Sequence, residues 1–150
     1  MMDQHFQPLQ SVMTTDVTSL PPSARVVEAA KLMKELNVGA IPICEGRRLI
    51  GMLTDRDIVV RLVAEQRDPG ERVDTIMSGQ VDYCYEDQDA DEAVHIMQDR
   101  QIRRLPIVNR ERELIGIVSL GDLAVTSDTG ASGEALEQIS QPAKPTRKAI

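Results

Sequence analysis

Apolar and polar residues follow each other along the chain in spacings that predict both helices and strands. Residues 26–36 carry apolar side chains at helical spacing, and a short extended piece at 17–20 precedes them. Two apolar runs, 41–44 and 49–53, flank the polar turn "EGRR" and predict a β-hairpin. A second helix is predicted at 55–64. The unit is therefore β-α-β-β-α.

The same order of elements recurs further along the chain, which indicates an internal repeat. Residues 12–44 match residues 76–108, and one extra residue in the second hairpin loop shifts the later matches. One such unit has a small sheet with an apolar face that it cannot bury alone, whereas two copies packed about a pseudo-twofold axis can. The predicted fold class is thus α+β, a mixed α/β fold. The second copy predicts a helix at 91–101, strands at 105–108 and 114–118, and a helix from Leu120.

Composition shifts and turn residues divide the chain into predicted segments. The tail is rich in small, polar, Pro and Gly residues, which favours a flexible segment with one helical turn near 134–139. The predicted segments are a flexible N-terminus at 1–10, a first repeat at 11–66, a linker at 67–73, a second repeat at 74–125 and a flexible tail at 126–150.

One motif occurs in both copies, as "GMLTDRD" at 51–57 and "GIVSLGD" at 116–122. Thr54 and Asp57 in the first copy correspond to Ser119 and Asp122 in the second. A hydroxyl followed three residues later by an acid is a capping-box pattern at a helix start. The same groups would also suit a ligand site. The recurrence of the motif does not distinguish a helix cap from a ligand site, because a duplication would preserve a capping box in both copies.

Composition and charge exclude several classes of function. Aromatic residues make up 2% of the chain and the formal net charge is −7, which disfavours binding to a nucleic-acid backbone. The N-terminal sequence "MMDQHFQPLQ" shows no signal peptide, and no run approaches the roughly 18 apolar residues of a membrane span. We therefore expect a cytoplasmic protein with no nucleic-acid or membrane partner.

Candidate catalytic and metal-binding residues are sparse. Cys44 and Cys84 form no CxxC pattern and are expected to be buried and reduced, with a disulfide between them left open. His5 and His95 lie too far apart in sequence to suggest a zinc site, and His95 is expected on the outer side of its helix. We find no nucleophile beside a base, no phosphate-binding loop and no dinucleotide motif. The sequence therefore predicts no enzyme, no metal and no required cofactor.

These motifs in this order resemble a tandem CBS-domain pair, or Bateman module. The resemblance rests on Val12-Met13-Thr14 and Ile76-Met77-Ser78 at the head of the repeats, on "VGAIPI" and "IRRLPI" before the hairpins, and on the twin motifs above. It covers about residues 11–124. The chain is similar to small stand-alone bacterial CBS pairs, including the hypoxic-response type.

The resemblance implies an adenosine-containing regulatory ligand: AMP, ADP, ATP, S-adenosylmethionine or NAD. In the family the aspartate holds the ribose hydroxyls, the Ser or Thr lies near the phosphate, and groups before the hairpin clasp the adenine. Carried over, the first site would comprise Val17, Thr18, Ala40, Ile41 and Pro42 with Thr54 and Asp57. The second would comprise Val81, Arg104, Leu105 and Pro106 with Ser119 and Asp122.

Arginines near these motifs would supply cations for phosphates: Arg56, Arg103 and Arg104. For Arg103 and Arg104 a solvated, salt-bridged face is the alternative. They replace Gly39 and Ala40 of the first copy, and Asp82 replaces Thr18, so the two sites are not expected to be equivalent.

Two functions follow from the resemblance. The first is a sensory module that signals ligand binding to a separate, unknown protein target. The second is a ligand-free scaffold that dimerises through its CBS helices, in which the motif residues only cap helices. Both include a homodimer.

Overall fold

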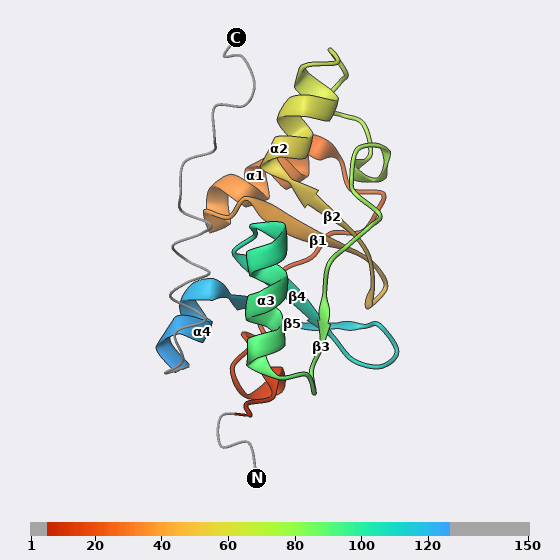
Figure 1. Cartoon of the computed structure of the whole chain (residues 1–150). Coiled ribbons are helices and arrows are strands. Elements are labelled where there is room, and N and C mark those ends of the chain that lie inside the picture. Colours follow the sequence, from red (N-terminus) through yellow and green to blue (C-terminus); the bar gives the residue numbers. More distant parts are fainter. Residues whose placement is uncertain (1–5, 127–150) are drawn as a thin grey trace, which may run out of the picture.

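The structure is a computed structural model that describes residues 6–126, with the side chains of its last two residues left out (Figure 1). The tail was predicted at 126–150, and its residues 127–150, with the predicted helical turn, lie outside the described residues, as do residues 1–5. No helix among the described residues is long and apolar enough to cross a membrane.

The first repeat contains one long helix, a hairpin and a second helix. Its elements are α1 (Val26–Leu36), β1 (Ala40–Glu45), β2 (Arg48–Thr54), α2 (Asp55–Asp57) and the π-helical segment η2 (Ile58–Val63). The predicted helix at 55–64 is thus present, but its second part is π-helical: the N–H of Ala64 bonds to the carbonyl of Val59, five residues back. The predicted extended piece at 17–20 contributes a single bridge, from Leu20 to Ile43.

The second repeat has the complete β-α-β-β-α order that the sequence predicts. Its elements are β3 (Cys84–Tyr85), α3 (Ala90–Arg100), β4 (Arg104–Val108), β5 (Leu114–Ser119) and α4 (Leu120–Thr126). Strand β4 lies between a parallel β3 and an antiparallel β5. Both hairpins carry a bulge at the same place, after Ile43 in one and after Ile107 in the other. The equivalent irregularity supports a common origin of the two copies.

Each repeat buries its own apolar core, and the segment leading into each repeat packs on the other one. Leu9, from the 3₁₀ turn η1 (Leu9–Ser11), is fully buried in the core of the second repeat. Val73, from the 3₁₀ turn η3 (Val73–Thr75), is fully buried in the core of the first. Figure 1 shows the red N-terminal turn beside α3 and the yellow-green linker beside β2. The two repeats are therefore joined by an exchange of their leading segments.

Backbone bonds fix this exchange at the two hairpins. Thr14 and Ile117 bond to each other in both directions, and Ser78 and Met52 do the same. The predicted flexible N-terminus also differs from the structure near its end, because the N–H of Leu9 donates to the carbonyl of Gln88 at 2.9 Å. A further bridge between Arg48 and Glu113 joins the two hairpin ends.

Candidate functional site

The repeated motif forms a helix cap in both copies, as the capping pattern predicts. In the first, the Thr54 hydroxyl accepts the Asp57 N–H at 3.0 Å, and the Asp57 carboxylate accepts the Thr54 N–H at 2.9 Å. In the second, Ser119 and Asp122 make the same two bonds at 3.0 and 3.3 Å. The hydroxyl and the carboxylate therefore each satisfy a helix N–H.

A cavity of about 380 Å³ lies beside the first of these caps, between the two repeats. Thr54 and Asp57 of the first repeat line it, together with residues that lead into β4 of the second. The lining residues are Gly39, Ala40, Met52, Thr54, Asp57, Ser78, Gln80, Val81, Asp82, Ile102, Arg103, Arg104 and Pro106.

Around this cavity the first motif meets other residues than those that the sequence assigned to its site. Thr54 and Asp57 meet Val81, Arg104 and Pro106, which were assigned to the other site. The reason is the exchange of leading segments: Ser78 pairs with Met52 of β2, and this brings residues 78–82 of the second repeat to the first repeat's motif. The first repeat's motif thus shares its cavity with residues of the second repeat.

Of the predicted site residues, seven line the cavity: Ala40, Thr54, Asp57, Val81, Arg103, Arg104 and Pro106. Eight do not: Val17, Thr18, Ile41, Pro42, Arg56, Leu105, Ser119 and Asp122. Ile41 and Leu105 are buried in the cores instead and are 1% and 0% exposed. On β4, Leu105 lies between the lining residues Arg104 and Pro106, whose side chains point to the other face of the strand. Arg56 is exposed on the outer surface of α2.

Six lining residues were not predicted as site residues: Gly39, Met52, Ser78, Gln80, Asp82 and Ile102. Asp82 was noted only as a departure between the copies. Ser78 is the last residue of the second Ile-Met-Ser head, and its hydroxyl accepts the N–H of Gln80 at 3.3 Å. The sequence offered one signal for residues 78–82, which is their match to residues 14–18. This match places the segment beside a hairpin but does not say which of the two hairpins.

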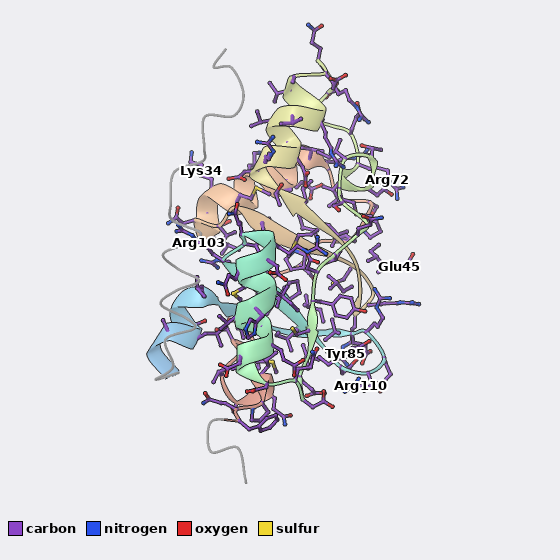
Figure 2. All side chains as sticks on the ribbon, in the orientation of Figure 1. Lys34, Glu45, Arg72, Tyr85, Arg103 and Arg110 are labelled. Atoms are coloured by element: carbon purple, nitrogen blue, oxygen red, sulfur yellow. The ribbon has the colours of Figure 1, made fainter. Side chains whose placement is uncertain are left out.

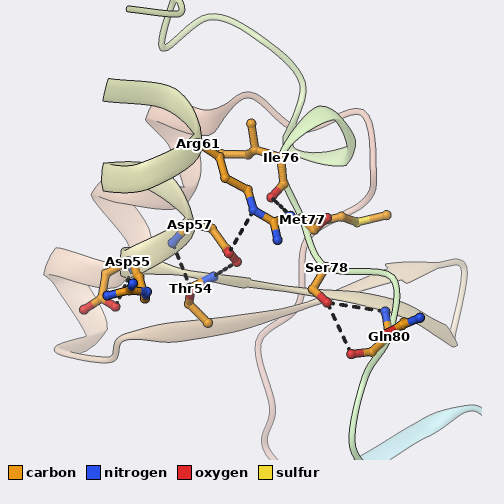
Figure 3. A network of polar contacts seen from close by, with 9 residues as sticks. Thr54, Asp55, Asp57, Arg61, Ile76, Met77, Ser78 and Gln80 are labelled. Atoms are coloured by element: carbon orange, nitrogen blue, oxygen red, sulfur yellow. Dashed lines mark hydrogen bonds and ion pairs between the residues drawn. The ribbon is translucent and has the colours of Figure 1, made fainter. Parts of the chain in front are cut away.

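Arg61 connects the capped aspartate to the exchanged segment, as Figure 3 shows. Its Nε lies 3.8 Å from Oδ1 of Asp57. Its Nη1 donates to the carbonyls of Ile76 at 3.3 Å and Met77 at 3.5 Å. The Asp57 side chain is 15% exposed, so this cation partly neutralises a carboxylate that is largely withdrawn from water. Arg61 thereby connects the cavity wall to the segment that leads into the second repeat.

The cysteines lie away from the cavity wall. Cys44 and Cys84 are both buried and free. Burial raises the pKa of both thiols, and for Cys84, with Glu92 as a second cause, it reaches about 12. Among the residues described, no group of three or more His, Cys, Asp or Glu is placed to hold a metal ion.

The sequence of this chain matches a known domain family. The CBS domain model matches residues 9–64 and 73–126, so the chain belongs to the CBS domain family. It is 45% identical over 133 residues to the CBS domain-containing protein YhcV of Bacillus subtilis, covering 88% of this chain and 94% of that one. It is 36% identical over 121 residues to hypoxic response protein 1 of Mycobacterium tuberculosis, covering 77% and 81%.

Solved structures agree with this assignment. The crystal structure of Hypoxic Response Protein I with two coordinated zinc ions matches with a TM-score of 0.72 at 32% identity, covering 79% of this chain and 98% of that one. The CBS domain pair of protein MJ0100, in complex with 5′-methylthioadenosine and S-adenosyl-L-methionine, matches with a TM-score of 0.69 at 24% identity, covering 80% and 94%. The second likeness is one of fold alone.

Proposed function

We propose that this CBS pair is a regulatory module that binds an adenosine-containing ligand in the cavity between its repeats. The observation that carries the proposal is the meeting of Thr54 and Asp57 with Val81, Arg104 and Pro106 around one cavity of about 380 Å³. Small-molecule sites of about 300–1,000 Å³ are ordinary in proteins. A separate protein would read the arrangement of repeats that the ligand favours.

The chemistry of the wall suits the parts of such a ligand. The resemblance assigns the ribose hydroxyls to the aspartate, and Asp57 still has acceptor capacity after taking the Thr54 N–H, because each carboxylate oxygen has two lone pairs. Val81, Pro106 and Ala40 offer apolar contact for a base. The MJ0100 pair bound adenosine compounds on the same fold, which supports this ligand class.

Calorimetric titration with AMP, ADP, ATP, S-adenosylmethionine and NAD tests the proposal. The decisive variant is Asp57→Asn, whose amide oxygen still accepts the Thr54 N–H while the charge is lost. We expect binding of at least one compound, weakened about ten-fold or more by Asp57→Asn. Asp55→Asn is the matched control, because Asp55 is an exposed acid two residues away that does not line the cavity. No binding by any of the five compounds would overturn the proposal.

A second function, assembly through the helices, is favoured by an apolar surface on η2. Val59, Val60 and Val63 are 58%, 44% and 62% exposed, although valine is usually buried. The resemblance points to a second copy of this chain as the partner, in a homodimer. This role is compatible with ligand binding, since Val59, Val60 and Val63 do not line the cavity.

A further inference from the structure

Two methionines occupy equivalent places where each leading segment packs on the other repeat. A Cβ built on Gly51 would lie 2.5 Å from the sulfur of Met77, and a Cβ built on Gly116 would lie 2.5 Å from the sulfur of Met13. Met77 packs against the core of the first repeat and Met13 against the core of the second. Each exchanged segment is therefore held by a thioether that lies directly on a glycine.

Exposure separates the methionines of the described residues into two groups. Met13 and Met77 are partly exposed, and so is Met52, which lines the cavity. Met97 is fully buried and Met33 is 7% exposed. Oxidation of a sulfur atom requires contact with the oxidant. The thioethers of the exchanged segments are therefore open to oxidants, whereas Met33 and Met97 are shielded.

The two cysteines are poorer targets for a peroxide than these thioethers. Cys44 and Cys84 are both buried. The thiolate is the form of cysteine that reacts with peroxides, and burial raises the pKa of both thiols, which keeps them protonated at neutral pH. Oxidation would therefore reach the partly exposed methionines first.

An oxygen added to either sulfur would enter a place that is already filled. The carbonyl oxygen of Ser78 lies 3.0 Å from the Cβ position on Gly51, and it is an acceptor, as a sulfoxide oxygen is. The N–H groups of Ser78 and Met52 are taken, because each donates to the other residue's carbonyl at 3.0 Å. Thr14 and Ile117 bond to each other in the same way. A polar oxygen without a donor at these contacts is costly.

We propose that Met13 and Met77 are sites of reversible oxidation, and that their sulfoxides open the two contacts between leading segment and opposite repeat. Hydrogen peroxide is the oxidant: the sulfur lone pair attacks one peroxide oxygen, the O–O bond breaks, the sulfur loses two electrons and water leaves. Methionine sulfoxide reductases restore the thioether. The proposal is independent of any ligand. For Met77 it reaches the cavity, because the pairing of Ser78 with Met52 brings residues 78–82 there.

The repeats also meet at their hairpin ends, and this contact contains other residue types. Among the described residues, the apolar cluster there includes Leu49 and Tyr85 and has no methionine. The Arg110 guanidinium lies 4.2 Å over the ring of Tyr85, and both residues are labelled in Figure 2. The N–H of Leu49 donates to the carbonyl of Arg112 at 3.0 Å. We therefore expect oxidation to open the leading segments while the hairpin ends stay joined.

Peroxide treatment of the full chain, followed by peptide mass spectrometry, tests where oxidation occurs. We expect Met13 and Met77 to gain one oxygen each before Met33 and Met97 do. Earlier oxidation of Met33 and Met97 would overturn the proposal, because the shielded sulfurs would then be the reactive ones.

Amide hydrogen exchange, followed by NMR, tests what oxidation does. We expect exchange at Ser78 and Thr14 to become about ten-fold faster or more, while Leu49 at the hairpin end keeps its parent rate. The unfolding midpoint should fall by about 5 °C or more. Treatment with methionine sulfoxide reductases A and B should restore both. Unchanged exchange at Ser78 and Thr14 in protein oxidised at both methionines would overturn the proposal.

Leucine variants assign the effect to these two sulfurs. Met13→Leu with Met77→Leu keeps apolar side chains of similar volume and removes both thioethers. We expect peroxide to leave the unfolding midpoint of this variant unchanged. The matched control, Met33→Leu with Met97→Leu, should respond to peroxide as the parent does. A peroxide effect of parental size in the first variant would overturn the proposal and point to Met52. If the first variant fails to fold, Met77→Leu alone replaces it and must lose the response at Ser78 while keeping that at Thr14.

Discussion

Thr54 and Asp57 bond to each other twice, each side chain accepting the other residue's backbone N–H, at 3.0 and 2.9 Å. The same two side chains line the cavity between the repeats. Helix capping and ligand binding are therefore not exclusive explanations of the motif. A variant that only removes a side chain would disturb both, so the two roles have to be separated by the choice of substitution.

Thr54→Ala tests the capping role. It removes the acceptor of the Asp57 N–H, and we expect the free energy of unfolding to fall by about 1 kcal/mol. Urea denaturation of Thr54→Ala and Thr54→Ser measures this, and the serine variant retains the parent's stability because its hydroxyl takes the same bond. Equal stability of the alanine variant and the parent would show that the cap contributes nothing.

Gly51→Ala tests the exchange of leading segments. A Cβ at residue 51 would lie 2.5 Å from the Met77 sulfur and 3.0 Å from the Ser78 carbonyl oxygen. We expect a loss of about 1–3 kcal/mol in the free energy of unfolding, as for an overpacked core. The pseudo-symmetric Gly116→Ala, which meets Met13 at the same 2.5 Å, should lose a similar amount.

Gly79→Ala is the control for this experiment, because nothing lies within 4 Å of a Cβ there. We expect it to change stability by less than about 0.5 kcal/mol. Combining Gly51→Ala with Met77→Ala removes the sulfur but not the Ser78 oxygen. If the double variant is no more stable than the sum of the two single changes predicts, the contact with Met77 is not the cause of the lost stability.

Repetition in the sequence explains both what could be predicted and what could not. The helices, the hairpins and the capping boxes depend on local spacing, and they were found. The partner of each leading segment was not, because Met13 and Met77 are equivalent residues, as are Gly51 and Gly116. The sequence alone is equally compatible with Met77 packing against Gly51 or against Gly116. Only the packing shows that it lies on Gly51, and the pairing of motifs with walls follows from that choice.

The π-helical segment η2 was missed for a different reason. The spacing of Ile58, Leu62 and Val63 fits an ordinary helix, and a shift of bonding to the fifth residue leaves no mark in composition. The cavity residues that follow the second Ile-Met-Ser head, such as Gln80, likewise carry no motif of their own. They become site residues only through the backbone pairing of Ser78 with Met52.

Cys84 predicts a dependence of stability on alkaline pH. Burial raises the pKa of its thiol from 9.0 to about 12. The folded protein therefore holds this proton where the unfolded chain has lost it, and the contribution to stability is complete below pH 9 and is lost as pH rises toward 12. Between pH 8 and pH 10 we expect a loss of about 1.4 kcal/mol from this group.

Urea denaturation at these two pH values, in the parent and in Cys84→Ala, isolates the effect. The alanine variant lacks the thiol but keeps every other titrating group, so the difference between the two pH dependences belongs to Cys84. Equal pH dependence in both proteins would show that the thiol ionises as readily in the folded state as in the unfolded chain.

The valines of η2 predict how the chain assembles. Val59 and Val63 are four residues apart on one side of the helix and are 58% and 62% exposed. Val59→Glu with Val63→Glu places charge on that surface, and burying a charge at an interface without a partner is costly. We expect the parent to sediment as a dimer and the double glutamate variant as a monomer at the same concentration, with its unfolding midpoint retained. Val59→Ile with Val63→Ile keeps the surface apolar and should remain dimeric. If the glutamate variant still forms a dimer, the interface lies on other helices. If the parent is a monomer, no second copy covers these valines and the proposed assembly is wrong.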